Sequence, residues 1–328
     1  MINYMDEMYN LAHDNNVLLS LMMELLTCCN EECVHCYIPE HNNMGLETDV
    51  VKRVISEFRE LGGLNLSLTG GEIFLRSDIF KIIEYARSLN LRVFLLTNAS
   101  LITEEIARKL RKLNIAELSV SIYSLAPEIH DRITKRQGSL ERTLRGLSYA
   151  KAQGIRIMVK TPLMECNKYS YKDLKKYCID NGYKYMASAI IFSKSNGDDS
   201  VKDLSINTEE MSIIAKEVAN LEPVGKKNYY EEACGSLKYM LAIDSIGDVF
   251  PCNSFLYNVG NIKNDSLSKI WANKKLKKIQ NIKKEDLKKC TNCELQGVCS
   301  RCPGLAWLED GDYMGCSSTA MLNARMRL

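Results

Sequence analysis

The chain has 328 residues, of which 46% are hydrophobic and 26% are charged, and 43 basic against 41 acidic side chains give a net charge of +2. This length suits one large domain with a smaller appendage, and the near-neutral charge argues against nucleic acid as a partner. The 13 cysteines are the unusual count. Residues 1–16 lack a basic stretch, and no run reaches about 18 apolar residues, so we predict neither a signal peptide nor a membrane span. The sequence therefore predicts a cytoplasmic protein whose cysteines stay reduced and hold metal or perform redox chemistry.

The first 190 residues alternate between strand-like and helix-like patterns. Such alternation is typical of parallel strands joined by right-handed helical crossovers. Six strand–helix units fall short of the eight in a closed barrel, so we predict an α/β fold with a partial, TIM-like (βα)6 barrel. The expected strands are 17–26, 64–69, 91–97, 115–122, 155–161 and 184–192, and the expected helices are 46–61, 78–89, 102–113, 139–153 and 170–181.

The pattern changes after residue 193. A polar loop at 193–200 leads to an expected helix at 207–221, and the chain becomes rich in cysteine from Cys234 onward. Residues 239–251 have the pattern of a β-hairpin around a glycine turn. We therefore place the barrel in residues 1–193, a bridging region in 194–233 and a second, cysteine-rich domain in 234–328.

The first cysteine motif directly follows the first expected strand. Cys29, Cys33 and Cys36 are spaced Cys-x3-Cys-x2-Cys and are followed by Tyr37. Active sites of parallel sheets gather at the C-terminal ends of the strands, so this loop lies where a site is expected. Three thiolates can hold one [4Fe–4S] cluster and leave one iron open. The alternative is a zinc site completed by another nearby side chain, Cys28 or His35.

This motif and its position resemble the radical SAM superfamily. In that family the open iron chelates the amino and carboxylate groups of S-adenosylmethionine. Gly70-Gly71-Glu72, after the second strand, resembles the family's GGE motif, which contacts the methionine amino group, although Ile73 stands where proline is usual. Ala99 replaces a family glycine and Tyr123 replaces an aspartate. The resemblance implies an S-adenosylmethionine site made by Tyr37, Gly70, Gly71, Glu72, Asn98, Ser121, Arg132 and Arg136.

The second cysteine constellation lies in the C-terminal region. Its spacing, with Gly260-Asn261-Ile262 and Ile270-Trp271 between the two halves, resembles the SPASM domain, an extension that binds auxiliary [4Fe–4S] clusters. The resemblance implies three [4Fe–4S] clusters in all. One auxiliary cluster is held by Cys290, Cys293, Cys299 and Cys316, and the other by Cys234, Cys252 and Cys302.

The second of these sets has only three cysteines. It implies either an open iron or an oxygen ligand such as Glu231 or Glu232. The alternative is a pair of structural zinc sites, because Cys-x2-Cys pairs also bind zinc. Cys28, Cys166 and Cys178 are not assigned to any cluster. Cys166, just past the fifth strand, is a candidate hydrogen-atom donor to a substrate radical; the alternative is that it is an inert buried thiol.

The resemblance implies a radical SAM maturase that modifies a ribosomally made peptide by a thioether or carbon–carbon crosslink or by epimerisation. The alternatives are a radical SAM dehydrogenase or maturase acting on a small molecule or a folded protein, and a non-enzymatic zinc protein. About 28 residues precede Cys29, so leader recognition is expected to use a separate protein or to be unnecessary. A flavodoxin or ferredoxin is the expected electron donor, and we expect no nucleic-acid or membrane partner.

Overall fold

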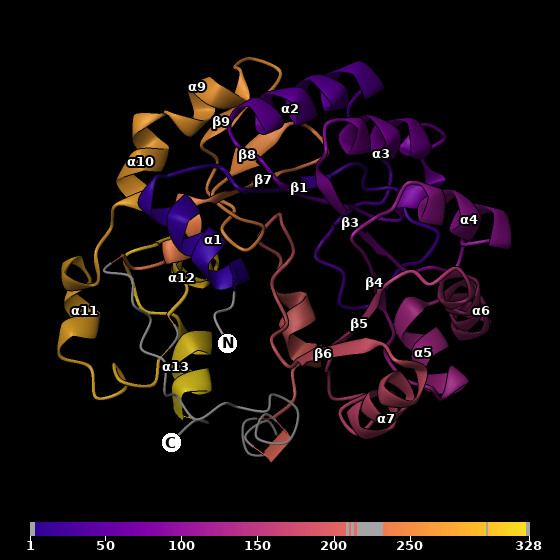
Figure 1. Cartoon of the computed structure of the whole chain (residues 1–328). Coiled ribbons are helices and arrows are strands. Elements are labelled where there is room, and N and C mark those ends of the chain that lie inside the picture. The colour runs from indigo at the N-terminus through magenta and orange to yellow at the C-terminus, as the bar shows by residue number, and fades with distance from the viewer. Residues whose placement is uncertain (1–3, 208–209, 211–212, 215–231, 300, 326–328) are drawn as a thin grey trace.

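The structure is a computed structural model of the whole chain and describes residues 4–207, 210, 213–214, 232–299 and 301–325. Within these ranges, nine strands form one curved sheet with helices packed around it (Figure 1). The strand order is β6-β5-β4-β3-β2-β1-β7-β8-β9. The two edge strands of the sheet are therefore β6, the last strand of the barrel, and β9, from the cysteine-rich region.

Six parallel strands make up the first part of the sheet. Every neighbouring pair from β1 to β6 is parallel, which confirms the predicted (βα)6 arrangement. The last strand is shorter than the predicted 184–192, because the apolar residues 190–192 turn away to line a cavity instead of pairing. The strands are β1 Ser20–Glu24, β2 Asn65–Thr69, β3 Arg92–Thr97, β4 Glu117–Ser121, β5 Ile157–Pro162 and β6 Lys184–Ser188.

The crossover helices cover the outer, convex face of this sheet (Figure 1). In α2 the buried side chains Val51, Val54, Ile55 and Phe58 recur at helical spacing, so one apolar stripe faces the strands. Thr103 caps the N-terminus of α4 (Glu104–Lys112) by accepting a hydrogen bond from the amide of Ile106. The outer helices are α2 Thr48–Glu60, α3 Ile79–Ser88, α4 Glu104–Lys112, α6 Ser139–Ala152 and α7 Tyr171–Asn181.

The two faces of each strand differ in burial. Leu21, Val120 and Val159 are 1%, 0% and 0% exposed and belong to the core shared with the helices. Their neighbours in sequence, such as Ser121 and Lys160, are half-buried and face the barrel interior, because side chains alternate across a strand. The interior is therefore polar enough to hold a site.

Within the first 193 residues, two helices escaped the sequence prediction. One is α1 (Tyr4–Asp14), whose Tyr9 ring packs against Tyr239 at a centroid distance of 5.2 Å. α5 (Pro127–Thr134) is short and begins with proline, a residue that marks turns as often as first helical positions. The expected helix at 207–221 falls largely outside the described residues and stays a prediction.

The cysteine-rich half continues the barrel sheet. The predicted hairpin is confirmed as β7 (Met240–Ile243) and β8 (Asp248–Phe250), and β9 (Gly260–Asn261) follows it. β7 also pairs in parallel with β1, so the hydrogen-bonded sheet runs across the predicted domain boundary. None of the described helices has the length and apolar character that crossing a bilayer requires. The remaining elements are η1 Ile73–Leu75, η2 Ser200–Leu204, η3 Gly235–Lys238, α9 Leu267–Trp271, α10 Lys274–Gln280, η4 Lys284–Asp286, α11 Lys288–Thr291, α12 Pro303–Asp310 and α13 Ser318–Arg325.

Candidate active site and metal centres

The first cysteine loop is held against the turn that follows β2. The amides of Gly71 and Glu72 donate hydrogen bonds to the carbonyls of Leu26 and Cys28, each at 2.9 Å. A Cβ atom on Gly71 would lie 2.1 Å from the Cys28 oxygen, and one on Gly70, whose φ is +140°, would lie 2.3 Å from the Leu26 oxygen. Only glycine allows this approach. The predicted residues Gly70 and Gly71 therefore set the position of the cysteine loop.

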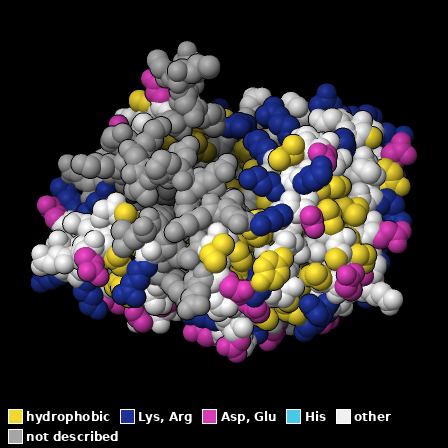
Figure 2. Space-filling view, turned by 90° about the horizontal axis from the view of Figure 1, so that it is seen from below, with side chains coloured by type: hydrophobic (Ala, Val, Ile, Leu, Met, Phe, Trp, Pro, Cys, Tyr) yellow, Lys and Arg dark blue, Asp and Glu magenta, His cyan; other side chains and the backbone are white. Residues whose placement is uncertain are grey.

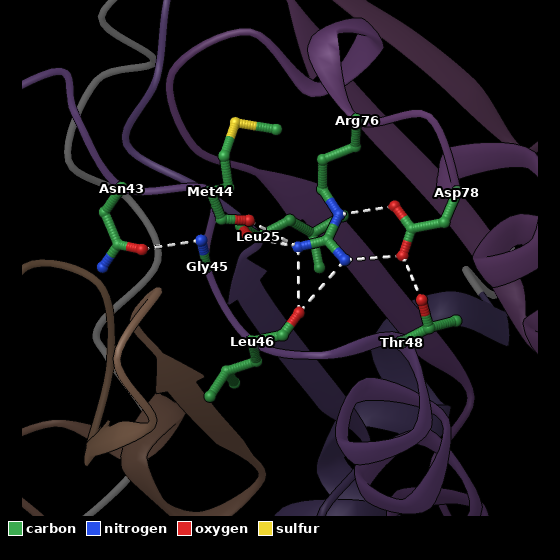
Figure 3. A network of polar contacts seen from close by, with 8 residues as sticks. All are labelled: Leu25, Asn43, Met44, Gly45, Leu46, Thr48, Arg76 and Asp78. Carbon is green, nitrogen blue, oxygen red and sulfur yellow. Dashed lines mark hydrogen bonds and ion pairs between the residues drawn. The ribbon is translucent and has the colours of Figure 1, made fainter.

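A buried arginine anchors the chain on both sides of this loop. The guanidinium of Arg76, which is 6% exposed, pairs with the carboxylate of Asp78 at 2.6 and 2.9 Å (Figure 3). It also donates to three backbone carbonyls at 2.8 to 3.1 Å. Those carbonyls belong to Leu25, Met44 and Leu46. One side chain thus joins the end of β1, the segment after the cysteine loop and the turn after β2.

The three thiols of the loop interact electrostatically with one another. Burial raises the pKa of Cys29 to about 12, and the charge of Cys36 adds to this rise. Burial also raises the pKa of Cys33, whose Sγ lies 3.6 Å from the Tyr123 hydroxyl. The Sγ of Cys36 lies 3.4 Å from Nε2 of His41. Thiolates at these positions require a nearby positive charge, which bound iron supplies.

Glu72 joins the ends of β2 and β3. Its side chain is fully buried, and its carboxylate accepts hydrogen bonds from the Thr97 hydroxyl at 2.8 Å, the Asn98 amide at 2.9 Å and the Phe74 amide at 3.0 Å. Burial raises its pKa, and these hydrogen bonds oppose the rise. The carboxylate is thus engaged within the protein, and its contact with the methionine amino group stays a prediction.

Asn98 lies beside the first thiol of the loop. Its Nδ2 donates to Oδ1 of Asn30 at 2.8 Å and lies 4.0 Å from the Cys29 sulfur, while its Oδ1 accepts from the Ser100 hydroxyl at 2.7 Å. Asn30 in turn donates to that hydroxyl at 2.8 Å. The next residue, Ala99, has φ +61°, a left-handed conformation that the glycine usual in the family adopts without strain. The amide network fixes the strand end next to the cluster loop.

Tyr37 links the cysteine loop to β1. Its hydroxyl donates to the Glu24 carboxylate at 2.6 Å, and its side chain is 39% exposed at the mouth of the barrel. Burial raises the pKa of Glu24, and the negative charge of Asp244 adds to this rise. Since Asp244 directly follows β7, the hairpin of the second half contributes a carboxylate to the barrel mouth.

Of the residues predicted to bind S-adenosylmethionine, Ser121 faces the barrel interior, whereas the two arginines do not line it. Ser121 ends β4 and pairs with Lys160 across the sheet, facing the interior. The side chains of Arg132 and Arg136 are both exposed, and neither guanidinium group forms a hydrogen bond or ion pair with a described residue. Arg142, which the sequence analysis did not single out, is a cation close to the cysteine loop, since its charge counters the rise of the Glu31 pKa that burial causes.

A cavity of about 290 Å³ opens between the cysteine loop and the ends of β5 and β6. His35 packs edge-on against the Tyr123 ring at 5.0 Å, and its Nδ1 is buried with no partner among the described residues. Burial lowers the pKa of His35 to about 4, so its ring is neutral at pH 7. The sequence analysis named His35 only as an alternative zinc ligand and missed it as a residue that lines this cavity, although its place between Cys33 and Cys36 is a signal. The cavity lining includes His35, Tyr37, Lys160, Met186, Ile191 and Phe192.

A second hollow, of about 410 Å³, lies on α7. That helix runs along the lower side of Figure 1, and the view from below in Figure 2 shows Lys and Arg side chains close to hydrophobic ones. Lys172, Lys175, Lys176 and Ile179 line the hollow. It contains no cysteine and none of the predicted cofactor residues.

Cys166 lies close to the first cysteine loop in space. It is half-buried after β5 and packs against the cluster of Tyr123, Ile133 and Met164, as Cys33 does. A thiol in that position borders the same region as the cavity residue Ile191. Its role as a hydrogen-atom donor stays a prediction.

One auxiliary set of thiols comes together around the start of α12. Burial raises the pKa of Cys252 to about 12, and the charges of Cys302 and Cys234 add to the rise. Close packing brings these segments together, because a Cβ on Gly304 would lie 2.2 Å from the Ser254 carbonyl oxygen. The three thiols proposed for the open cluster are therefore neighbours.

The other auxiliary set is nearer the surface. Burial raises the pKa of Cys290, and the charges of Cys316 and Cys293 add to it. The Sγ of Cys299 lies 3.8 Å from the Ala320 carbonyl. The sequence analysis named two possible oxygen ligands for the set of Cys234, Cys252 and Cys302. Glu231 lies outside the described residues, and the Glu232 carboxylate contacts the His13 ring and the Lys238 ammonium at 3.1 and 3.2 Å.

The donor sets match iron–sulfur chemistry. Thiolates of a [4Fe–4S] cluster bind separate irons and stand farther apart than the ligands of one ion. Each set would supply only soft sulfur ligands, the donors that such clusters use.

Comparison with protein families identifies the class. Residues 23–176 match the radical SAM superfamily, and residues 234–294 match SPASM, an iron–sulfur cluster-binding domain. The chain therefore belongs to the radical SAM proteins that carry a SPASM domain. This confirms the family that the cysteine motifs indicated and favours iron–sulfur clusters over zinc.

Individual relatives have different reactions. The chain is 29% identical to the AdoMet-dependent heme synthase of Methanosarcina barkeri, over 89% of this chain and 93% of that protein. It is 28% identical to the subtilosin biosynthesis protein AlbA of Bacillus subtilis, over 77% of this chain and 59% of that protein. The fold resembles Streptococcus suis SuiB bound to its precursor peptide SuiA, with a TM-score of 0.76 and 17% identity over 96% of this chain and 79% of that chain.

Proposed function

We propose that this chain is a radical SAM maturase that abstracts a hydrogen atom from a ribosomally made peptide and leaves a crosslink or an epimerised residue. Cys29, Cys33 and Cys36 would hold the cluster that binds S-adenosylmethionine. When bound, this pair would supply the radical chemistry, a one-electron reductive cleavage of S-adenosylmethionine that yields the hydrogen-abstracting radical. The chain's own residues bind the substrate, orient it and exclude water.

The cavity beside the cysteine loop carries this proposal. It adjoins His35 and Tyr37 of the loop, so a substrate group inside it would lie next to the site of radical formation. Its volume of about 290 Å³ is at the lower limit of ligand pockets, which are roughly 300–1,000 Å³. Such a volume suits one peptide side chain better than a whole tetrapyrrole. The peptide-linked names of AlbA and SuiB support the same interpretation.

The two auxiliary thiol sets would give the substrate radical an electron acceptor. Cys290, Cys293, Cys299 and Cys316 would hold a closed cluster, and Cys234, Cys252 and Cys302 the other. An external flavodoxin or ferredoxin would supply or remove electrons, and a separate protein would present a substrate that has a leader.

A small-molecule substrate is the second candidate. Its support is the identity to a heme synthase over nearly the whole chain, which exceeds the coverage of AlbA. Such an enzyme would act on a carboxylated iron porphyrin at the same mouth of the barrel.

Anaerobic reconstitution with iron, sulfide, S-adenosylmethionine and dithionite tests both candidates. We expect about 12 irons per chain for three [4Fe–4S] clusters, and release of 5′-deoxyadenosine. A Cys33→Ala variant should lose that release, and stoichiometric zinc in place of iron would overturn the enzyme proposal. Incubation with peptides encoded beside the gene, and separately with an iron coproporphyrin, then shows by mass change which substrate class is used.

Cys166→Ala tests the epimerisation branch. If the thiol donates the hydrogen atom, the variant should still release 5′-deoxyadenosine but lose the epimerised product. Undiminished product would remove Cys166 from the mechanism.

A further inference from the structure

Among the described residues that line the cavity beside the cysteine loop, Lys160 is the one cation. This residue lies on the inward face of β5, in register with Ser121 on one side and Met186 on the other. It is half-buried, and the surrounding side chains Met186, Ile191 and Phe192 are apolar. The ammonium group is thus drawn into a largely apolar space.

No described residue compensates this charge directly. The ammonium group of Lys160 forms no hydrogen bond or ion pair with any described residue, whereas nearby Glu117 pairs with Lys184 at 3.2 Å. Burial lowers the pKa of Lys160, and the more distant charge of Glu117 opposes that shift. A half-buried cation without a protein partner keeps only part of its hydration, and a ligand of opposite charge would supply the missing interaction.

We infer that Lys160 binds a carboxylate of the ligand that enters this cavity. One ammonium group matches the single charge of a carboxylate, whereas a phosphate carries closer to two charges and recruits several donors. The apolar walls then suit an aliphatic or aromatic group attached to that carboxylate. This inference rests on the proposed function only in placing the substrate in this cavity.

Two molecules can bring a carboxylate to this position. One is the substrate, through a peptide carboxylate or a porphyrin propionate. The other is S-adenosylmethionine, because Ser121, the cross-strand neighbour of Lys160, belongs to the predicted cofactor site, and the arginines predicted for the cofactor carboxylate are exposed. Both share the same chemistry, and a binding experiment separates them.

The test uses anaerobically reconstituted protein and measures binding by calorimetry. The probes are S-adenosylmethionine, 3-phenylpropionate and the uncharged 3-phenylpropionamide. Lys160→Met keeps the length and apolar character of the side chain, and Lys160→Arg keeps its charge. The matched control is Lys184→Met, which also removes a lysine near Glu117 but does not line the cavity.

We expect Lys160→Met to weaken one of the two carboxylate ligands by about 10- to 100-fold, the usual effect of losing a charged hydrogen bond. Loss confined to phenylpropionate assigns the site to the substrate, and loss confined to S-adenosylmethionine assigns it to the cofactor. Lys184→Met and phenylpropionamide should show no change, and Lys160→Arg should retain most of the affinity. The inference would be overturned if Lys160→Met bound both carboxylate ligands with the affinity of the wild type. It would also be overturned if the wild type bound 3-phenylpropionate no better than 3-phenylpropionamide and Lys160→Met left S-adenosylmethionine binding unaltered. Release of 5′-deoxyadenosine by the wild type, measured separately, reports on the proposed function.

Discussion

Replacing Arg76 with methionine should destabilise the fold strongly, because this one guanidinium satisfies acceptors from three separate segments. The variant would leave the carboxylate of Asp78 and three backbone carbonyls without their donor. Breaking a buried ion pair by removing one partner typically costs about 3–5 kcal/mol, and each buried unsatisfied acceptor about 1–3 kcal/mol. Because water can enter and these costs do not add, we expect a total loss of about 3–5 kcal/mol.

Urea denaturation of the reconstituted protein under anaerobic, reducing conditions measures this loss. The control is Arg108→Met, since the Arg108 side chain is 58% exposed and its guanidinium lies as far as 3.7 Å from the Glu104 carboxylate. Exposed pairs of this kind contribute roughly 0.3–0.5 kcal/mol. Asp78→Asn, made in the wild type and in the Arg76→Met background, completes a double-mutant cycle and should show strong coupling. A loss below about 1 kcal/mol for Arg76→Met, or additive effects in the cycle, would refute the reasoning.

Further predictions concern the metal centres and pH. Gly71→Ala should lower bound iron by about four per chain, one [4Fe–4S] cluster, because its Cβ would strike the cysteine loop, whereas Gly297→Ala, whose Cβ meets nothing within 4 Å, should leave iron unchanged. Cys293→Ser and Cys302→Ser should each weaken a different cluster, so iron analysis of the double variant should show the sum of the two losses; no further loss in the double variant would mean that the two thiols serve one cluster. Burial tends to raise the pKa of Asp131, but hydrogen bonds from the first turn of α6 outweigh burial and lower this pKa. The ionised carboxylate therefore stabilises the fold above about pH 4, and this stabilisation is lost as the pH falls further. Urea midpoints measured from pH 3 to 7 should therefore fall less steeply at the acidic end for Asp131→Asn than for the wild type, and parallel profiles would contradict this assignment.

Much of the barrel was predictable from local patterns. Alternating apolar segments located all six strands, because each strand and its crossover helix leave their own periodicity in the sequence. The spacing of Cys29, Cys33 and Cys36 was equally local, and it predicted a loop that the structure indeed places at the end of β1. The glycines at 70 and 71 were also identified, although the close approach that requires them appears only in three dimensions.

Other features have no local signal. Lys160 lies in a strand whose pattern predicts only alternation, and its isolation inside the cavity depends on residues from β6 and the loop after it. Arg142 comes near Glu31 of the cysteine loop only because α6 packs beside that loop, so the exposed Arg132 and Arg136 were equally good candidates from sequence. The pairing of β7 with β1 joins segments from opposite ends of the chain, and periodicity does not identify a strand's distant partner.

This pairing also constrains the order in which the chain assembles. During synthesis β1 is made early, but its second neighbour, β7, emerges only after the whole barrel half. Until then one edge of β1 presents unpaired backbone groups, which invite association with other chains. Removing the cysteine-rich half would make that edge permanent, so a protein cut at residue 193 should aggregate even though the six parallel strands and their helices are all present.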